Sequence, residues 1–197
     1  MQGPHGARID PPPDQPAADS DSPPPPVAGR EAASRSRGSK FLFFGIALAV
    51  LAADRLTKWA VINSFDEGDS QPLLGSVVSL TRRHNTGAAF GLLPTWTMLL
   101  AVVAAIVIVV LLVYGVSGLL RSRALIVAVG LQLGGAAGNL YDRLLYGYVV
   151  DFLDLHFWPA FNVADAAITV GAIVVALFLL RGGEKDEGPQ GPKHTEP

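Results

Sequence analysis

Two aspartates in apolar surroundings are the candidate catalytic residues of this chain. Asp151 lies within residues 149–153, Val-Val-Asp-Phe-Leu, and Asp165 lies among Ala, Val and Ile within residues 161–180. Two carboxylates a few ångströms apart cannot easily both ionise, so they tend to share one proton. Such a pair can activate water with one carboxylate and protonate a leaving amine with the other. The two residues therefore predict acid–base hydrolysis.

Simpler roles compete for these two residues. Asp165 is close to a predicted helix start and is a candidate helix cap, while Asp151 is compatible with an acid in an exposed loop. Asn162 is itself a candidate N-cap residue, which weakens the cap interpretation of Asp165. Two further acids are competitors for the catalytic role. Asp142, which precedes an arginine, is expected to be an ion-paired support, and Asp154 is expected to be exposed.

Asp54 and Lys58 place opposite charges within an apolar segment. They are four residues apart, so they share one face of a helix and can pair. Ionisable groups within a membrane are costly and usually mark a functional site. Mutual neutralisation is at least as well supported as a chemical role, so we expect this pair to support a site. Arg55 is expected to snorkel toward water or to pair locally.

Glycines recur in the third apolar segment of the chain. Gly130, Gly134 and Gly138 are spaced every four residues, with Gly135 beside them. Small residues at this spacing let helices approach closely, which favours a packing role over a chemical one. Close packing would also bring Asn139 against the neighbouring helices.

Several other chemistries lack the residues that they need. The absence of cysteine excludes disulfides, thiolate zinc sites and a cysteine nucleophile. There is no His-Glu-x-x-His motif, His84 and His156 are isolated, and there is no Gly-x-Ser-x-Gly elbow. A serine–lysine dyad would have to use Lys58, which has no obvious serine partner. We therefore expect no metal and no cofactor.

The composition indicates a membrane protein. The 197 residues are 50% hydrophobic and 16% charged, whereas soluble domains carry about 25% charged residues. Four apolar segments are each close to the roughly 20 residues that span a bilayer. They cover residues 41–62, 91–120, 124–141 and 161–180, and Pro94 suits a helix start. The net charge of −2 and the lack of a basic stripe give no indication of nucleic-acid binding.

The first apolar segment also has an alternative interpretation. Basic residues followed by apolar residues 41–53 resemble a cleaved signal peptide. Apolar residues resume at 59–62, however, and no convincing small-residue cleavage site precedes Asp54. A spanning helix is therefore favoured.

The distribution of Lys and Arg predicts the orientation of the segments. The basic residues expected in the cytoplasm are Arg30, Arg35, Arg37, Lys40, Arg121, Arg123, Arg181 and Lys185. Those expected outside are Arg82, Arg83 and Arg143. The predicted fold class is an all-α polytopic membrane protein with four transmembrane helices and both termini cytoplasmic. The β-forming residues 77–81 predict a small extracytoplasmic β element.

The same pattern predicts the domain organisation and the position of the polar residues. Residues 1–40 are expected to be a disordered proline-rich cytoplasmic tail, residues 41–181 the membrane domain, and residues 182–197 a second disordered tail. Asp54 lies 13 residues beyond Phe41, roughly 20 Å along a helix. The external connections, residues 63–92 and 142–160, bring the remaining polar motifs to the same outer depth. Aromatic residues of the second connection suit a membrane interface: Tyr146, Tyr148 and Trp158.

Five ordered motifs resemble those of the lipoprotein signal peptidases, the bacterial type II signal peptidases. They occupy residues 54–58, 85–90, 134–143, 149–152 and 161–165, and the resemblance covers about residues 41–181. Taken alone, the motif that begins at Asn85 is favoured as a turn before an apolar run. The proline-rich extension lies outside the resemblance, and the short interval between Asp151 and Asp165 leaves the shape of the second external loop open.

The resemblance implies an intramembrane aspartyl protease of the bacterial cytoplasmic membrane, with its active site on the extracytoplasmic side. It implies cleavage of prolipoproteins on the amino side of a diacylglyceryl-modified cysteine, with Asp151 and Asp165 as the catalytic dyad. The positions that support or line the site are Asp54, Lys58, Asn85, Gly135, Asn139, Asp142, Arg143 and Asn162. The expected partners are the lipidated substrates and membrane lipid, with no nucleic acid and no required oligomer.

Two other function classes remain as alternatives. A proton-coupled transporter would use buried carboxylates but needs polar groups along a path to both faces. The inner halves of the second and fourth segments are almost purely apolar, which argues against it. A membrane scaffold built on the glycine face would leave the paired aspartates without a role.

Overall fold

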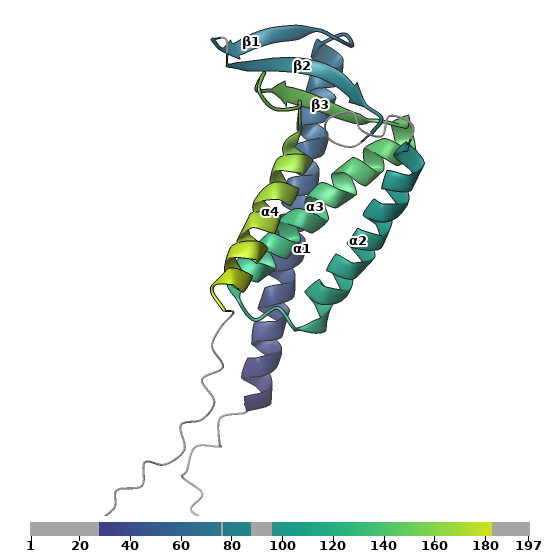
Figure 1. Ribbon diagram of the computed structural model, residues 1–197. Helices are drawn as coiled ribbons and strands as arrows, with labels where there is room; N and C mark the ends of the chain where they lie inside the picture. Colours follow the sequence, from purple (N-terminus) through teal and green to yellow (C-terminus); the bar gives the residue numbers. More distant parts are fainter. Residues whose placement is uncertain (1–27, 76, 88–95, 183–197) are drawn as a thin grey trace, which may run out of the picture.

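The computed structural model describes residues 28–75, 77–87 and 96–182. In chain order these residues form α1 (Ala28–Ser64), β1 (Ser70–Leu74), β2 (Val78–Asn85), α2 (Thr97–Ser117), α3 (Arg123–Tyr146), β3 (Val149–Asp154) and α4 (Val163–Leu180). The helices form a bundle, and the three strands form a small sheet across one end of it (Figure 1). The start of α1, the turn between α2 and α3, and the end of α4 lie toward the opposite end (Figure 1).

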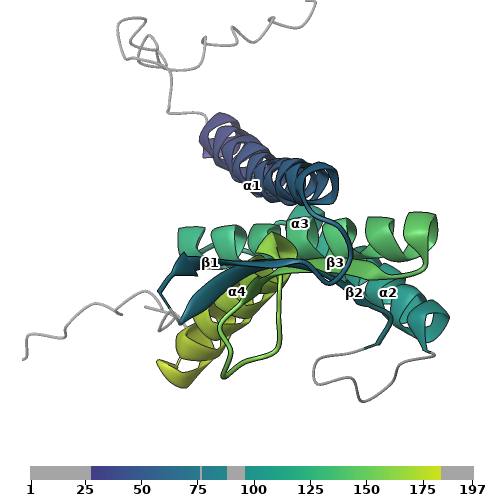
Figure 2. The ribbon, with the colours of Figure 1, turned by 90° about the horizontal axis from the view of Figure 1, so that it is seen from above.

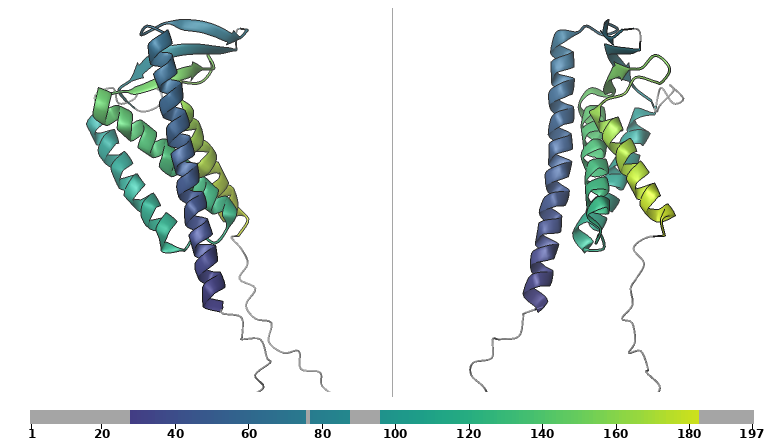
Figure 3. Two further views of the ribbon diagram at one scale, coloured as in Figure 1. Left: turned by 180° about the vertical axis from the view of Figure 1, so that it is seen from behind. Right: turned by 90° about the vertical axis from the view of Figure 1, so that its left-hand side faces the viewer.

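Three helices of the described ranges are long and apolar enough to cross a membrane: α2, α3 and α4. In α2 only Ala101 is buried, and its large aliphatic side chains point outward. A helix that is apolar all round is typical of a membrane span, because hydrocarbon replaces water around it. The first helix, α1, runs along the side of the bundle (Figure 3) and carries charged residues within its apolar stretch.

Two helices are longer than the apolar segments that predicted them: α1 extends beyond residues 41–62, and α3 extends beyond residues 124–141. The helix α1 begins at Ala28, so residues 28–40 are helical, whereas the sequence analysis assigned them to a disordered tail. This stretch follows Pro26, the last proline before the helix, and contains Ala, Arg and Glu, which favour helices. The helix α3 continues to Tyr146, where Gly147 adopts a φ of 79° and donates its N–H to the Arg143 carbonyl. A glycine is the residue that adopts this left-handed cap at least cost.

Parts of the remaining expectations lie outside the described residues. These are the rest of the two tails (residues 1–27 and 183–197), the end of the motif that begins at Asn85 (residues 88–90), and the helix start expected at Pro94.

The glycines of α3 set its close contacts with two neighbours. A Cβ added to Gly134 would lie 2.5 Å from the Ala47 carbonyl oxygen of α1, and one added to Gly135 would collide with the Ala164 carbonyl oxygen of α4. Seen from above, α3 lies between α1 and α4 (Figure 2). The glycines that face α1 are Gly130, Gly134 and Gly138. The packing role predicted for these glycines is confirmed.

The strands form an antiparallel sheet in the order β1-β2-β3. The strand predicted at residues 77–81 is confirmed as part of β2, whereas β1 and β3 were not predicted. The expected external connection of residues 142–160 contains the last turn of α3 and the whole of β3. All but one of the β3 residues are buried, so its sequence lacks the alternation that marks a half-buried strand.

Candidate active site

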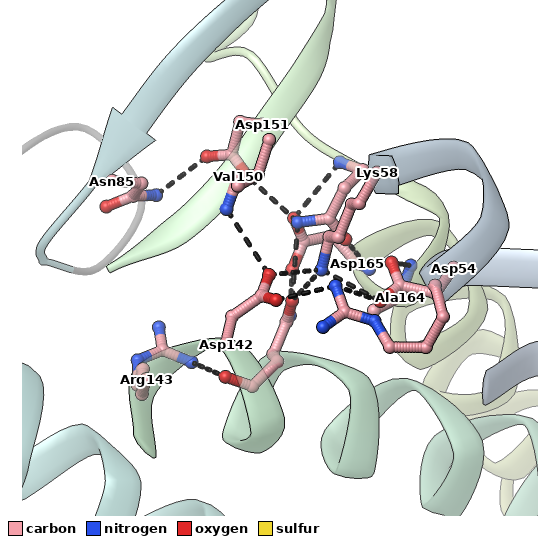
Figure 4. A network of polar contacts seen from close by, with 12 residues as sticks. Asp54, Lys58, Asn85, Asp142, Arg143, Val150, Asp151, Ala164 and Asp165 are labelled. Carbon is pink, nitrogen blue, oxygen red and sulfur yellow. Dashed lines mark hydrogen bonds and ion pairs between the residues drawn. The ribbon is translucent and has the colours of Figure 1, made fainter. Parts of the chain in front are cut away.

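Asp151 lies in β3 with both carboxylate oxygens bonded to amide donors (Figure 4). Asn85 Nδ2 donates to Oδ2 over 2.9 Å, and Asn162 Nδ2 donates to Oδ1 over 2.7 Å. The pairing of β2 with β3 places Asn85 opposite Val149, so the sheet register brings this amide to the carboxylate. Only 3% of Asp151 is exposed, which excludes the interpretation as an exposed loop acid.

The pKa of Asp151 is raised from 3.8 to about 7. Burial is the main cause because it penalises the charged form, and the nearby Asp165 carboxylate adds to the rise. The hydrogen bonds donated by Asn85 and Asn162 favour the charged form and limit the shift. A carboxyl group with a pKa near 7 exchanges a proton at neutral pH, as general acid–base catalysis requires.

Asp165 lies in the first turn of α4 and shares a capping box with Asn162. Asn162 Oδ1 accepts a hydrogen bond from the Asp165 N–H over 2.9 Å, and Asp165 Oδ2 accepts one from the Asn162 N–H over 3.2 Å. The other oxygen, Oδ1, accepts a hydrogen bond from Asn139 Nδ2 over 2.7 Å. The cap role considered for Asp165 is therefore present, and it leaves one carboxylate oxygen for contacts with the site.

Asn162 connects the two aspartates. Its amide nitrogen donates to Asp151, its amide oxygen accepts from Asp165, and the side chain is fully buried. The same nitrogen lies 3.3 Å from Asn139 Oδ1. The Asn162 side chain thus holds the Asp151 carboxylate and the Asp165 backbone, while the Asn162 N–H holds the Asp165 carboxylate. The structure brings together the pair singled out from the sequence.

A buried ion cluster joins α1 to α3 beside this pair (Figure 4). Lys58 Nζ lies 2.9 Å from Asp54 Oδ2 and 2.8 Å from Asp142 Oδ2. Arg55 Nη2 lies 2.5 Å from Asp142 Oδ1. Asp54, Lys58 and Asp142 are all inaccessible to solvent. The pairing expected between Asp54 and Lys58 is confirmed, and it is part of a larger cluster in which two acids and two bases offset one another.

Asp142 is an ion-paired support, as expected, but its partner is not its sequence neighbour Arg143. Arg143 donates hydrogen bonds to the carbonyl oxygens of Asn139, over 3.3 Å, and Gly87, over 3.5 Å. Consecutive residues of a helix point in different directions, so Asp142 and Arg143 cannot share a face. The partners of Asp142 come instead from α1, namely Lys58 and Arg55.

Asp54 and Asp142 also bind the backbone N–H of the residue that precedes each aspartate of the pair. The Ala164 N–H donates to Asp54 Oδ1 over 3.1 Å, and the Val150 N–H donates to Asp142 Oδ2 over 3.3 Å. Sequence reasoning missed this role because the donors are backbone groups, which leave no signal in residue type. The shared depth of the motifs was the only available indication.

A cavity of about 240 Å³ opens beside Asp165. Its polar side chains are Asn85, Asn139, Arg143, Asp165 and Thr169, and its larger apolar ones are Val149, Trp158, Phe161 and Ile168. An apolar cleft with a few convergent polar groups is typical of a ligand site. Asp151 does not line this cavity and reaches it through its hydrogen-bonded partner Asn85.

The structure places three other highlighted residues away from the pair. Asp154, expected to be exposed, is only 6% exposed and forms an ion pair with Arg83 over 2.7 Å. Gly135 contributes through the close contact of α3 with α4. His156 bonds to Ser79 over 3.0 Å. Within the described ranges, no three His, Asp or Glu side chains converge as metal ligands.

Known proteins match this chain over most of its length. The family model described as signal peptidase (SPase) II matches residues 46–181. A lipoprotein signal peptidase of Moorella thermoacetica is 45% identical over 149 residues, which are 75% of this chain and 99% of the relative. The lipoprotein signal peptidase of Pelotomaculum thermopropionicum is 47% identical over 145 residues, with coverages of 74% and 95%.

The fold is also similar to solved structures of bacterial membrane enzymes. One has a TM-score of 0.69 and 29% sequence identity, and the match covers 79% of this chain and 95% of the other. A second has a TM-score of 0.65 and 31% identity, with coverages of 73% and 94%. Sequence and fold agree, and the chain belongs to the signal peptidase II family.

Proposed function

We propose that the chain is an aspartic endopeptidase that removes signal peptides from prolipoproteins, cleaving on the amino side of a diacylglyceryl-modified cysteine. The substrate class is supported by the name that its relatives share, lipoprotein signal peptidase. The observation that carries the mechanism is the pair of Asp151 and Asp165 bridged by Asn162, with a pKa of about 7 for Asp151.

In the proposed reaction the pair begins with one proton. The ionised carboxylate takes a proton from water as the water oxygen attacks the carbonyl carbon of the scissile bond, and the protonated partner donates to the carbonyl oxygen. Collapse of the tetrahedral intermediate re-forms the carbonyl, breaks the C–N bond and transfers a proton to the leaving nitrogen. The products are the carboxyl end of the signal peptide and the free amino group of the lipidated cysteine.

The lipid on the substrate would supply much of the positioning energy. Each buried methylene contributes about 0.8 kcal/mol, so two acyl chains hold the adjacent peptide bond at a fixed depth. The cavity beside Asp165 would receive the peptide, with the amide of Asn139 and the guanidinium of Arg143 as polar contacts.

The proposed topology has four membrane spans, including α1, with both termini in the cytoplasm. The site then lies on the extracytoplasmic side of the bacterial cytoplasmic membrane. This topology is supported by the basic residues at the end of the bundle away from the sheet. It is also supported by the surface of α1: Asp54 and Lys58 are buried, whereas Leu48 and Leu56 are 67% and 65% exposed. An α1 of this kind presents apolar side chains to lipid.

The test uses the purified full chain, a precursor with and without the diacylglyceryl group, and the initial rate of signal-peptide release. Asp151→Asn and Asp165→Asn should each lower the rate by at least about 10³-fold while the lipidated precursor still binds. Asp154→Asn, in the same strand but outside the pair, should retain activity. The unlipidated precursor should be cleaved slower by orders of magnitude. Wild-type turnover by either Asn variant, with deamidation excluded, would remove that residue from the mechanism, and equal rates for both precursors would exclude the substrate class.

A further inference from the structure

A second cavity lies between α1 and the start of α3. The start of α3 is at the end of the bundle away from the sheet (Figure 1). Its volume is about 500 Å³. It is lined by Gly38, Ser39 and Leu42 of α1 together with Arg121, Arg123 and Ile126. None of these residues belongs to the candidate active site. We propose that this cavity binds the phosphate headgroup of an anionic phospholipid.

The two arginines supply positive charge to the cavity. In the part of the chain that the structure describes, neither Arg121 nor Arg123 has an acidic side chain within ion-pair distance. The first turn of α3 contains no acidic residue, and the N-cap residue Ser122 makes no side-chain cap hydrogen bond. The acids of the described ranges lie in the half of the molecule that carries the sheet, with Glu31 as the exception. An anion in the cavity would therefore be attracted by the two guanidinium groups.

Arginine is well suited to phosphate. Its planar guanidinium presents parallel N–H groups that match two phosphate oxygens. Arg121 and Arg123 are separated by one residue at the turn that enters α3, and both border the same cavity. Two guanidinium groups around one space favour a phosphate over a simple halide ion.

The apolar part of the lining favours a lipid over a free phosphate. Ile126 is 3% exposed and forms a closed apolar wall. Leu42, which lines the cavity, is 38% exposed. Its chain neighbour Phe41 is 71% exposed, and Leu119, in the turn between α2 and α3, is 68% exposed. Acyl chains attached to a bound headgroup would continue along these side chains.

The depth of the cavity is that of a lipid headgroup. The apolar span of α3 begins at Arg123, so the arginines lie at the boundary between hydrocarbon and water. Basic pockets between transmembrane helices at this level are suited to anionic lipid headgroups. The proposal goes beyond the proteolytic activity. It also does not depend on the orientation of the chain in the membrane, because lipid binding can be measured on protein purified in detergent.

The experiment measures lipid retention by native mass spectrometry on the purified full chain. The protein is incubated with phosphatidylglycerol or phosphatidylcholine of identical acyl chains, and separately with glycerol 3-phosphate. The wild type should retain phosphatidylglycerol about tenfold more than phosphatidylcholine. Arg121→Gln/Arg123→Gln should lose this preference, whereas Arg37→Gln/Arg181→Gln, which removes the same charge outside the cavity, should keep it.

A steric pair of variants tests the cavity itself and leaves every charge in place. A Cβ added to Gly38 or to Gly45 of α1 meets no atom within 4 Å, so both positions accept a side chain. Gly38 lines the cavity and Gly45 does not. Gly38→Leu should therefore abolish the preference for phosphatidylglycerol, and Gly45→Leu should not. This pair remains informative if the double arginine variant fails to fold.

Four results would overturn the proposal. Equal loss in both double arginine variants, or no loss in Gly38→Leu, would assign the preference to diffuse surface charge. Equal retention of the two lipids by the wild type would remove the headgroup selectivity. Glycerol 3-phosphate that binds the wild type as tightly as the lipid does would identify a site for soluble phosphates. None of these results bears on cleavage, so the proteolytic proposal stands or falls separately.

Discussion

Lys58 Nζ donates a hydrogen bond to Asn139 Oδ1 over 3.1 Å and thereby determines which way the Asn139 amide faces. With its oxygen bound to the ammonium, the amide directs its nitrogen to Asp165 Oδ1 over 2.7 Å. The ion cluster is thus connected to the proposed catalytic pair through one side chain as well as through the backbone. Its loss should affect both the fold and the site.

Replacing Lys58 by methionine should destabilise the protein by about 3–5 kcal/mol, because it leaves buried Asp54 without its closest cation. The measurement is thermal unfolding of the purified variant together with its accumulation in the membrane. Lys40→Met, at the other end of the same helix, serves as the matched control. The double variant Asp54→Asn/Lys58→Met should recover much of the loss. A single variant as stable as the wild type would mean that the cluster does not stabilise the fold.

Adding a methyl group to Gly135 should separate α3 from α4. A Cβ there collides with the Ala164 carbonyl oxygen, which is backbone and cannot swing away. Overpacking of this kind costs about 1–3 kcal/mol, and a shift of α4 also moves Asp165 away from Asn139. Gly135→Ala should therefore lower both the melting temperature and the cleavage rate, whereas Gly45→Ala, where the added atom has open space, should lower neither. Full activity of Gly135→Ala would show that the contact tolerates a methyl group.

The ionisation of Asp151 should make stability fall as the pH rises. Its pKa is about 7 in the fold against an ordinary value of 3.8, so the folded state favours the protonated form. Its contribution is present at low pH and declines between about pH 4 and pH 7, by up to about 4 kcal/mol. The melting temperature of Asp151→Asn relative to the wild type should therefore increase from pH 4 to pH 8. A constant difference across this range would contradict the raised pKa.

A companion variant tests the cause of that shift. The charge of Asp165 is one of the factors that raise the pKa of Asp151. In Asp165→Asn the pH-dependent loss of stability should therefore move to lower pH. An unchanged pH profile would mean that the charge of Asp165 does not raise the pKa of Asp151.

The topology should be readable with reporter fusions. Fusions after Arg121 and after Arg181 should report the cytoplasm, because each of these basic residues follows the end of an apolar helix. Fusions near Gly68 and Gly147, which lie at the end of the molecule with the sheet, should report the exterior. A cytoplasmic signal at Gly68 would place the candidate site on the other side of the membrane.

The sequence predicted those elements that are marked by long apolar runs, regular residue spacing or a biased composition. The apolar runs located the helices, the glycine spacing predicted the contacts of α3, and β-forming residues located β2. The pairing of Asp54 with Lys58 followed from helix geometry alone. These features are local, so a short window of sequence contains them.

The remaining features depend on contacts between distant segments. The strand β3 is buried on both sides by elements that a window around Asp151 does not include. The partners of Asp142 come from α1, whereas sequence proximity suggested Arg143. The backbone donors of Val150 and Ala164 carry no residue-type signal at all. Sequence reasoning could therefore identify which residues converge but not which atoms bond.

The capping box of α4 makes Asp165, one residue of the proposed catalytic pair, part of the start signal of a helix. Asn162 and Asp165 are three residues apart because that spacing closes the reciprocal hydrogen bonds, and a cap of this kind stabilises a helix by about 1 kcal/mol. A relative that lost the activity would still gain from keeping both residues. Asp151 satisfies no such local requirement, and in its charged form it weakens the fold. The identity of the residue at position 151 should therefore separate working peptidases from inactive descendants, where the Asn-x-x-Asp motif would not.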